Sequence, residues 1–129
     1  MADVKRITNV GLGVISTALK GTTYSEPKYI GWGTGTTEPT ATDTALETPA
    51  VEARTLGTTS VETTTTANDT YRVTGLVTCT GTQKVITEAG LFTASTGGSL
   101  YARVTFDAVT VDPGDSILFT FDTVNTYSV

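Results

Sequence analysis

Residues 70–80 have the sequence TYRVTGLVTCT, and this stretch decides the fold class. In an extended chain successive side chains point to opposite faces, so every second residue lies on the same side. The first face carries Tyr71, Val73, Val77 and Cys79, and the second carries Arg72, Thr74, Thr78 and Thr80. Because the first set is apolar or aromatic and the second is polar, we expect a strand with one face against a core.

The segments on either side repeat this alternation between turns rich in glycine, proline, asparagine and aspartate. We expect a polar strand at 52–66, a turn at 67–69 and further strands at 84–93, from residue 100 and after a turn at 112–115. In these later strands Leu100, Ala102, Val104, Phe106, Ile117, Phe119 and Phe121 are expected to point inward, and Tyr101, Arg103 and Thr105 outward. Strands and turns at such regular spacing predict a mainly β protein, either an antiparallel β-sandwich or a partly open barrel.

Threonine supplies 31 of the 129 residues. Its β-branched side chain fits a pleated strand better than a helix, and its hydroxyl keeps a strand face soluble. The excess is concentrated in residues 34–66, whereas the later strands are rich in valine, leucine, isoleucine and phenylalanine. We therefore expect the later strands to form the core and the threonine-rich part to face neighbouring subunits.

Residues 8–20 predict a short N-terminal helix. Apolar side chains recur there at a spacing of three and four, Thr8 can cap the amino end, and Gly21 can follow the last turn. A short strand is expected at 28–32, and the stretch 36–49 is expected to form an ordered excursion or an extended arm. Long connections of this kind are usually functional or disordered.

The charge balance excludes several classes of function. The net charge is −5, so the chain lacks the basic stripe that nucleic-acid binding requires. It contains no histidine and one cysteine, which leaves no internal disulfide and removes the commonest metal ligand. The carboxylate pairs Asp43–Glu47 and Asp112–Asp115 lack the spacing of a calcium loop and are interpreted as a local cap and a turn. We expect no metal and no cofactor.

No catalytic constellation is evident, and we expect no enzymatic activity. Without histidine no ordinary base is available to activate a serine or threonine, and Cys79 lies on the apolar strand face. The three carboxylates Glu52, Glu62 and Glu88 are interpreted as surface charge that keeps strand edges apart. The glycine-rich residues 31–35 lack the lysine and the following helix of a phosphate loop.

The chain is expected to form one domain over 1–129, with an N-terminal segment at 1–24, a strand and arm at 25–50 and a β core at 51–129. No apolar leader and no membrane-spanning run of residues is present. We therefore expect synthesis and folding in a cytoplasm, without membrane contact.

Three segments occur in an order that resembles small structural proteins of tailed bacteriophages. They are residues 7–15 (ITNVGLGVI), residues 29–35 (YIGWGTG) followed by 43–46 (DTAL), and residues 86–92 (ITEAGLF) with a closing strand after 112–116 (DPGDS). The set is similar to capsid decoration (cement) proteins and to the amino-terminal attachment domain of some tail fibres. The resemblance implies a β-sandwich or barrel that is homo-oligomeric, often trimeric, with arms that reach neighbouring subunits.

From this resemblance we expect a virion structural protein, assembled in a host bacterial cytoplasm, that decorates the head surface and binds the major capsid protein. The alternatives are a tail, baseplate or fibre-adaptor protein and, from another class, a small carbohydrate-binding module that uses Tyr29 and Trp32. Trp32 is also interpreted as a core anchor. The candidate contact residues are Val4, Lys5, Arg6, Pro39, Thr42, Leu46, Pro49, Tyr127 and Val129.

Overall fold

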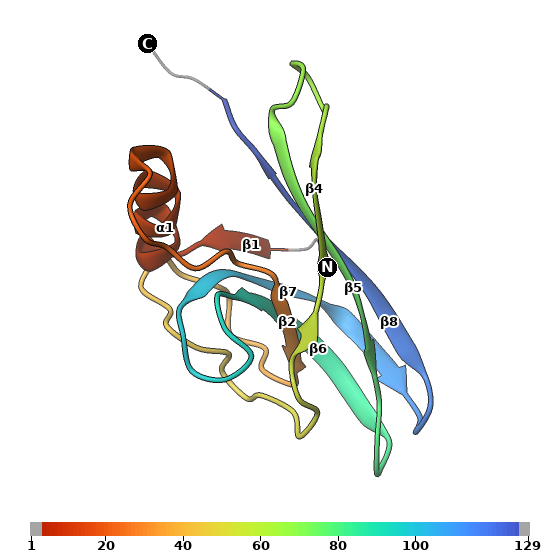
Figure 1. Cartoon of the computed structure of the whole chain (residues 1–129). Coiled ribbons are helices and arrows are strands. Elements are labelled where there is room, and N and C mark those ends of the chain that lie inside the picture. Colours follow the sequence, from red (N-terminus) through yellow and green to blue (C-terminus); the bar gives the residue numbers. More distant parts are fainter. Residues whose placement is uncertain (1–3, 127–129) are drawn as a thin grey trace.

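A computed structural model describes residues 4–126 of the chain. Within them two antiparallel sheets pack face to face and do not close into a barrel (Figure 1). The five-stranded sheet has the order β1 (Val4–Ile7), β7 (Leu100–Val111), β6 (Lys84–Phe92), β2 (Tyr29–Gly33) and β3 (Thr55–Leu56). The three-stranded sheet has the order β4 (Thr58–Glu62), β5 (Thr70–Thr78) and β8 (Ser116–Val124). The prediction of a mainly β sandwich is confirmed.

The helix α1 (Asn9–Lys20) begins and ends at the predicted capping residues. The Thr8 hydroxyl oxygen accepts a hydrogen bond from the backbone N–H of Gly11, and Gly21 adopts a left-handed conformation with φ 79°. The same hydroxyl donates to the carbonyl of Leu100, which fixes the start of the helix against β7. A side chain at Gly11 would overlap the carbonyl oxygen of Tyr101, so glycine permits this close approach.

The main core lies between the two sheets. It contains Ile30 and Trp32 from β2, Val73 and Val77 from β5, Cys79, and Ile86 and Leu91 from β6. The ring of Trp32 meets that of Phe119 edge to face, with centroids 6.5 Å apart. The predicted inward face of residues 70–80 and the role of Trp32 as a core anchor are both confirmed.

The polar strand predicted at 52–66 is divided between the two sheets. Residues 55–56 pair with β2 in one sheet and residues 58–62 pair with β5 in the other, and Gly57 lies between them. A side chain at Gly57 would come within 2.5 Å of Val73, so the chain crosses between sheets where glycine lets the backbone touch the core.

The predicted orientation of β7 is wrong for one of its faces. Tyr101, Arg103 and Thr105 were expected to face solvent, but each is at most 3% exposed. Arg103 and Thr105 are covered because a second layer of chain lies over the side away from the three-stranded sheet. Tyr101 instead points toward the three-stranded sheet, where its hydroxyl shares a hydrogen bond with Thr123 of β8 (2.9 Å), and Leu100, which was expected to point between the sheets, packs with Leu46 and Phe92. Ala102, Val104 and Phe106 do point toward the three-stranded sheet, where they remain half-buried.

The covering layer is residues 34–50, which we call the strap. Backbone hydrogen bonds join Thr34 to Thr48 and Asn9 to Ala41, and Gly33 forms a β-bridge with Pro49. Leu46 packs into a second apolar cluster with Phe92 and Leu100. The ordered excursion predicted for 36–49 is therefore present, but it folds back on the sheet and does not extend as an arm.

Candidate interaction surfaces

A buried carboxylate holds the strap to the sheet. Glu88 on β6 has no solvent exposure. Its carboxylate accepts hydrogen bonds from the backbone N–H groups of Gly35 (2.9 Å), Glu47 (2.9 Å) and Thr48 (2.7 Å). Both ends of the strap are thus fastened to one side chain, and such charge-assisted bonds are stronger than neutral ones. The interpretation of Glu88 as surface charge is wrong.

Arg103 completes this cluster from the neighbouring strand. Its Nε donates to Glu88 (2.9 Å) and its Nη1 donates to Asp43 on the strap (3.0 Å). Desolvation opposes ionisation of Asp43, but hydrogen bonds from Thr40 and the Arg103 guanidinium outweigh it and hold the pKa of Asp43 below 3.8. Asp43 therefore stays ionised near neutral pH, and the two bonds of Arg103 tie the strap to β7 as well as β6.

A second connection, which we call the Glu52 clip, joins the part of the chain that follows the strap to the far end of the sandwich. Glu52 accepts hydrogen bonds from Trp32 Nε1 (2.9 Å) and from the backbone N–H of Thr80 (2.9 Å), and it pairs with Lys84 (2.8 Å). Desolvation raises the pKa of Glu52, but the Lys84 ammonium and the other hydrogen bonds outweigh it and bring the pKa to about 2. Glu52 is therefore a structural anion, not free surface charge.

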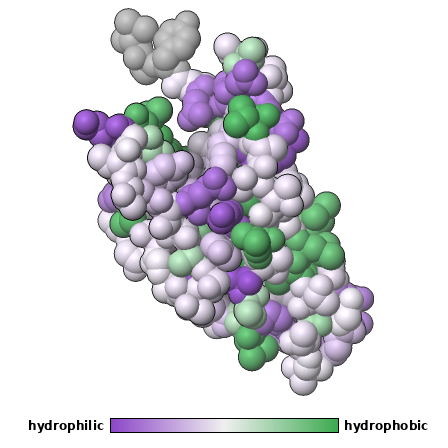
Figure 2. Space-filling model, in the orientation of Figure 1, coloured by the Kyte–Doolittle hydropathy of each residue, from purple (hydrophilic) through white to green (hydrophobic). Residues whose placement is uncertain are grey.

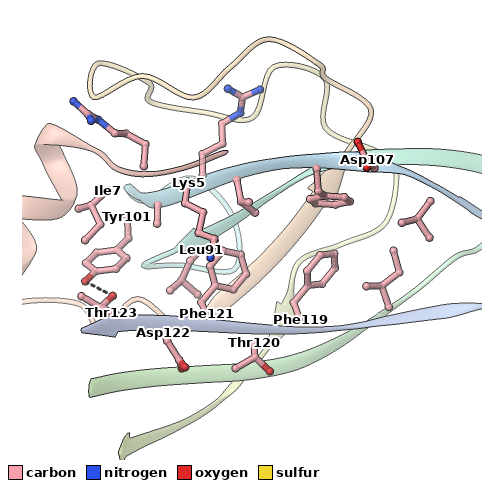
Figure 3. A pocket seen from close by; sticks show the side chains of 17 residues that line it. Lys5, Ile7, Leu91, Tyr101, Asp107, Phe119, Thr120, Phe121, Asp122 and Thr123 are labelled. Carbon is pink, nitrogen blue, oxygen red and sulfur yellow. Dashed lines mark hydrogen bonds between the residues drawn. The ribbon is translucent and has the colours of Figure 1, made fainter. Parts of the chain in front are cut away.

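On the opposite side of β7 the sandwich is open. A groove of about 680 Å³ runs between β1 and β7 on one wall and β8 on the other (Figure 3). Its floor is apolar and includes Phe106, Phe119 and Phe121, which are all half-buried. Figure 3 shows Lys5 reaching across the mouth of the groove toward the strand that carries Phe121 and Asp122. Half-buried aromatic side chains between two strand edges are features of a contact surface.

Further apolar side chains lie on the outer side of the three-stranded sheet. Leu76 and Leu118 are opposite each other on β5 and β8 and are 50% and 63% exposed. Figure 2 shows apolar surface gathered over the side of the molecule where β5 and β8 lie. β4 lies in the same sheet and exposes Thr58, and the expectation that the threonine-rich part faces neighbouring subunits stays a prediction.

The structure divides the nine candidate contact residues into three groups. Val4, Lys5 and Arg6 form β1, and Lys5 and Arg6 line the groove. In the strap, Thr42 and Pro49 are exposed, whereas Pro39 and Leu46 are buried in the protein's own fold. Tyr127 and Val129 lie outside the described residues. The structure thus brings the β1 residues to the groove and gives Pro39 and Leu46 a role in packing.

Sequence reasoning missed Glu88, Arg103 and the groove. A signal for the attachment of the strap to Glu88 was present, because Gly33 and Gly35 lie where a side chain would overlap Thr48 or come within 2.5 Å of Glu88. Alternating glycines beside a strand indicate close backbone approach. Nothing in the sequence indicated which carboxylate would meet them.

Other candidate sites have structural roles or are absent from residues 4–126. Those residues contain no group of three or more cysteine and acidic side chains placed to hold a metal ion. Trp32 is 2% exposed, so it cannot form a sugar-stacking platform with Tyr29. Asp43 caps Thr40, and Asp115 accepts from the Asp112 N–H, as predicted. No helix in this part of the chain is long and apolar enough to span a membrane.

These features define a small antiparallel β-sandwich protein with a locked strap on one side and an open, apolar edge on the other. The model of one protein family, described as podophage GP4 fiber I protein gp80, matches residues 9–126. The chain belongs to this family and is a bacteriophage structural protein related to tail fibre proteins. Neither the curated proteins nor the solved structures contain a significant match.

Proposed function

We propose that the chain is a tail-side structural component of the virion, acting in a fibre or as a fibre adaptor. The observation that carries this proposal is the family match over residues 9–126, whose description names a fiber protein. The fold is compatible with that role, because buried charge holds the strap rigidly while strand edges stay available to neighbours. The contact residues proposed for this role are Val4, Lys5, Arg6, Thr42 and Pro49.

Head decoration, with binding to the major capsid protein, is the second candidate. The resemblance of residues 7–15, 29–35 and 86–92 to cement proteins favours it. Both candidates require a non-enzymatic protein. The absence of histidine and the commitment of Glu52 and Glu88 to structural bonds support that part of the proposal. A hydrolase screen that detected turnover abolished by Glu62→Gln would contradict it.

Virion imaging with a position-specific label distinguishes the two locations. The turn at 95–98 is exposed and contains Gly97 and Gly98 at positive φ, so a short epitope inserted there leaves the strands intact. We expect antibody label at the tail fibres or their attachment point. Label distributed over the whole head would overturn the tail-side proposal in favour of head decoration. Virions without insertion serve as the control for non-specific label.

A further inference from the structure

A second and smaller pocket lies between α1 and the sandwich, and we call it the helix pocket. Its volume is about 190 Å³. The second half of α1 gives it an apolar wall that includes Ala18, and the connection after the helix contributes Tyr24 and Glu26. The sheets contribute Tyr71 of β5 and Tyr101 of β7. Pockets for drug-sized ligands measure about 300–1,000 Å³, so this one suits a single small group.

Three tyrosines give the helix pocket an aromatic lining. The Tyr71 hydroxyl donates to the carbonyl of Pro27 (2.8 Å), and the Tyr101 hydroxyl shares a hydrogen bond with Thr123 (2.9 Å, Figure 3). These bonds hold two of the rings in place, whereas Tyr24 is 48% exposed. The face of an aromatic ring is negative and attracts cations, most strongly where water is excluded. The lining therefore favours a cationic ligand.

Among the described residues, Glu26 is the one charged residue that lines the helix pocket. It is half-buried, and within residues 4–126 its carboxylate forms neither an ion pair nor a hydrogen bond. Burial raises the pKa of the Tyr71 phenol and the Glu26 carboxylate raises it further, so the two groups lie close together. Lys20 and Lys28, the cations nearest in sequence, do not line the pocket. Removing a carboxylate from water without a partner costs free energy, and a bound cation would offset that cost.

The lining also decides which kind of cation fits. A metal ion such as Ca²⁺ takes six to eight oxygen ligands, whereas the described residues hold no acidic cluster placed for a metal and this pocket has one carboxylate. A primary ammonium has three N–H donors that need acceptors, but the hydroxyls of Tyr71 and Tyr101 are already bonded within the protein. A quaternary ammonium needs no acceptor, and its methyl groups pack against aromatic rings.

We propose that the helix pocket binds a quaternary ammonium group, with the charged nitrogen beside Glu26 and its methyl groups against Tyr24, Tyr71 and Tyr101. Such a group is found in free choline and in the choline headgroup of a lipid. This inference goes beyond the proposed function and does not depend on it.

NMR titration of the full chain with choline chloride, at constant ionic strength, tests the proposal. We expect saturable chemical-shift changes at Ala18, Tyr24 and Glu26. The control ligand is the neutral isostere of choline, in which a tert-butyl group replaces the trimethylammonium group. We expect choline to bind at least about tenfold more tightly than this isostere. Equal affinities, or no saturable changes with choline, would overturn the proposal.

Two matched pairs of variants test the charge and the ring. Glu26→Gln should weaken choline binding about tenfold and leave the isostere unaffected, whereas Glu62→Gln, which lies outside the pocket, should change neither. Tyr24→Leu should weaken choline binding about threefold, and Tyr24→Phe, which keeps the ring, should preserve it. Tyr24 and Glu26 lie in the connection between α1 and β2, so these variants break no sheet. Choline binding that survives both Glu26→Gln and Tyr24→Leu would overturn the proposal.

Vesicles distinguish the two sources of the quaternary ammonium group. Co-sedimentation with phosphatidylcholine vesicles but not with phosphatidylglycerol vesicles, lost in Glu26→Gln, would support a lipid headgroup as the ligand. Choline binding without co-sedimentation would support a soluble ligand. Co-sedimentation with both kinds of vesicle, unchanged in Glu26→Gln, would overturn the assignment of a lipid headgroup to this pocket.

Discussion

The two faces of β7 differ in how completely they are covered, although their residues alternate along one strand. Arg103 and Thr105 face the strap and are buried, and Arg103 bonds to Glu88 of the sheet and Asp43 of the strap, whereas Val104 and Phe106 face the open groove. The polar face is therefore the closed one, and the apolar face is the incompletely covered one. A strand face is buried when another segment of the chain lies over it. The polarity of that face decides only which hydrogen-bonding or charged groups the covering segment must supply.

The largest expected effect on this difference between the two faces comes from removing the buried charge that holds the strap to the sheet. Glu88→Gln keeps the shape of the side chain but removes the fully buried one of the two carboxylates that pair with Arg103, and we expect the free energy of unfolding to fall by about 3 kcal/mol. Glu62→Gln removes an exposed carboxylate 3.9 Å from Arg72 and should cost less than about 1 kcal/mol. Urea denaturation measures both. Similar losses in the two variants would show that the strap is not held by buried charge.

A steric test separates the strap from the rest of the fold. Gly33→Ala would push a methyl group into the carbonyl of Thr48, so we expect a loss of about 1–3 kcal/mol. Gly13→Ala adds the same group on the helix, where nothing lies within 4 Å, and should stabilise the chain by roughly 0.5–1 kcal/mol. Thermal denaturation of the pair gives the signs. A neutral Gly33→Ala would mean that the strap can lift without penalty.

Acid titration probes the Glu52 clip at the far end of the sandwich. The pKa of Glu52 is lowered from 4.5 to about 2, so its contribution to stability is complete above about pH 4.5 and is lost as the pH falls toward 2. The free energy of unfolding should therefore decline across this interval. Glu52→Gln should be less stable at pH 7 and show a shallower decline. Identical pH profiles for the two proteins would remove Glu52 from this role.

The smallest expected effect is a difference in hydrogen exchange between neighbouring amides of β8, at the open side of the sandwich. It involves no change in stability. In a monomeric sample, the amides of residues 117, 119 and 121 should exchange slowly because they bond to β5. Those of residues 118, 120 and 122 should exchange at least about tenfold faster because they face the free edge. Hydrogen exchange followed by NMR resolves each amide. Uniform protection along β8 in the monomer would mean that its edge is already covered within one chain.

Local signals in the sequence were sufficient for the elements themselves. Thr8 and Gly21 bounded the helix, and the turn at 112–115 appears with Gly114 at φ 94°. The alternation in residues 70–80 predicted the correct inward face. Each of these features depends on neighbours a few residues away, so short-range preferences decide it.

The assignments that failed depend on contacts between distant parts of the chain. Arg103 is separated from Asp43 by 60 residues, and Glu88 from Thr48 by 40. A period of two distinguishes the faces of a strand, but it does not say that both faces will be covered. For that reason arginine and glutamate were placed at the surface, although each is buried with its partner.

By itself, the sequence determined a mainly β protein with one capped helix, a core of later strands and no evident site for proton chemistry. The tertiary structure alone decided that the strap folds back over the sheet, that Glu88 and Arg103 are buried, and that the sandwich stays open beside β8. The physical reason is the range of the interactions. Strand and turn preferences act locally, whereas covering a sheet face and neutralising a buried charge require segments that the fold brings together.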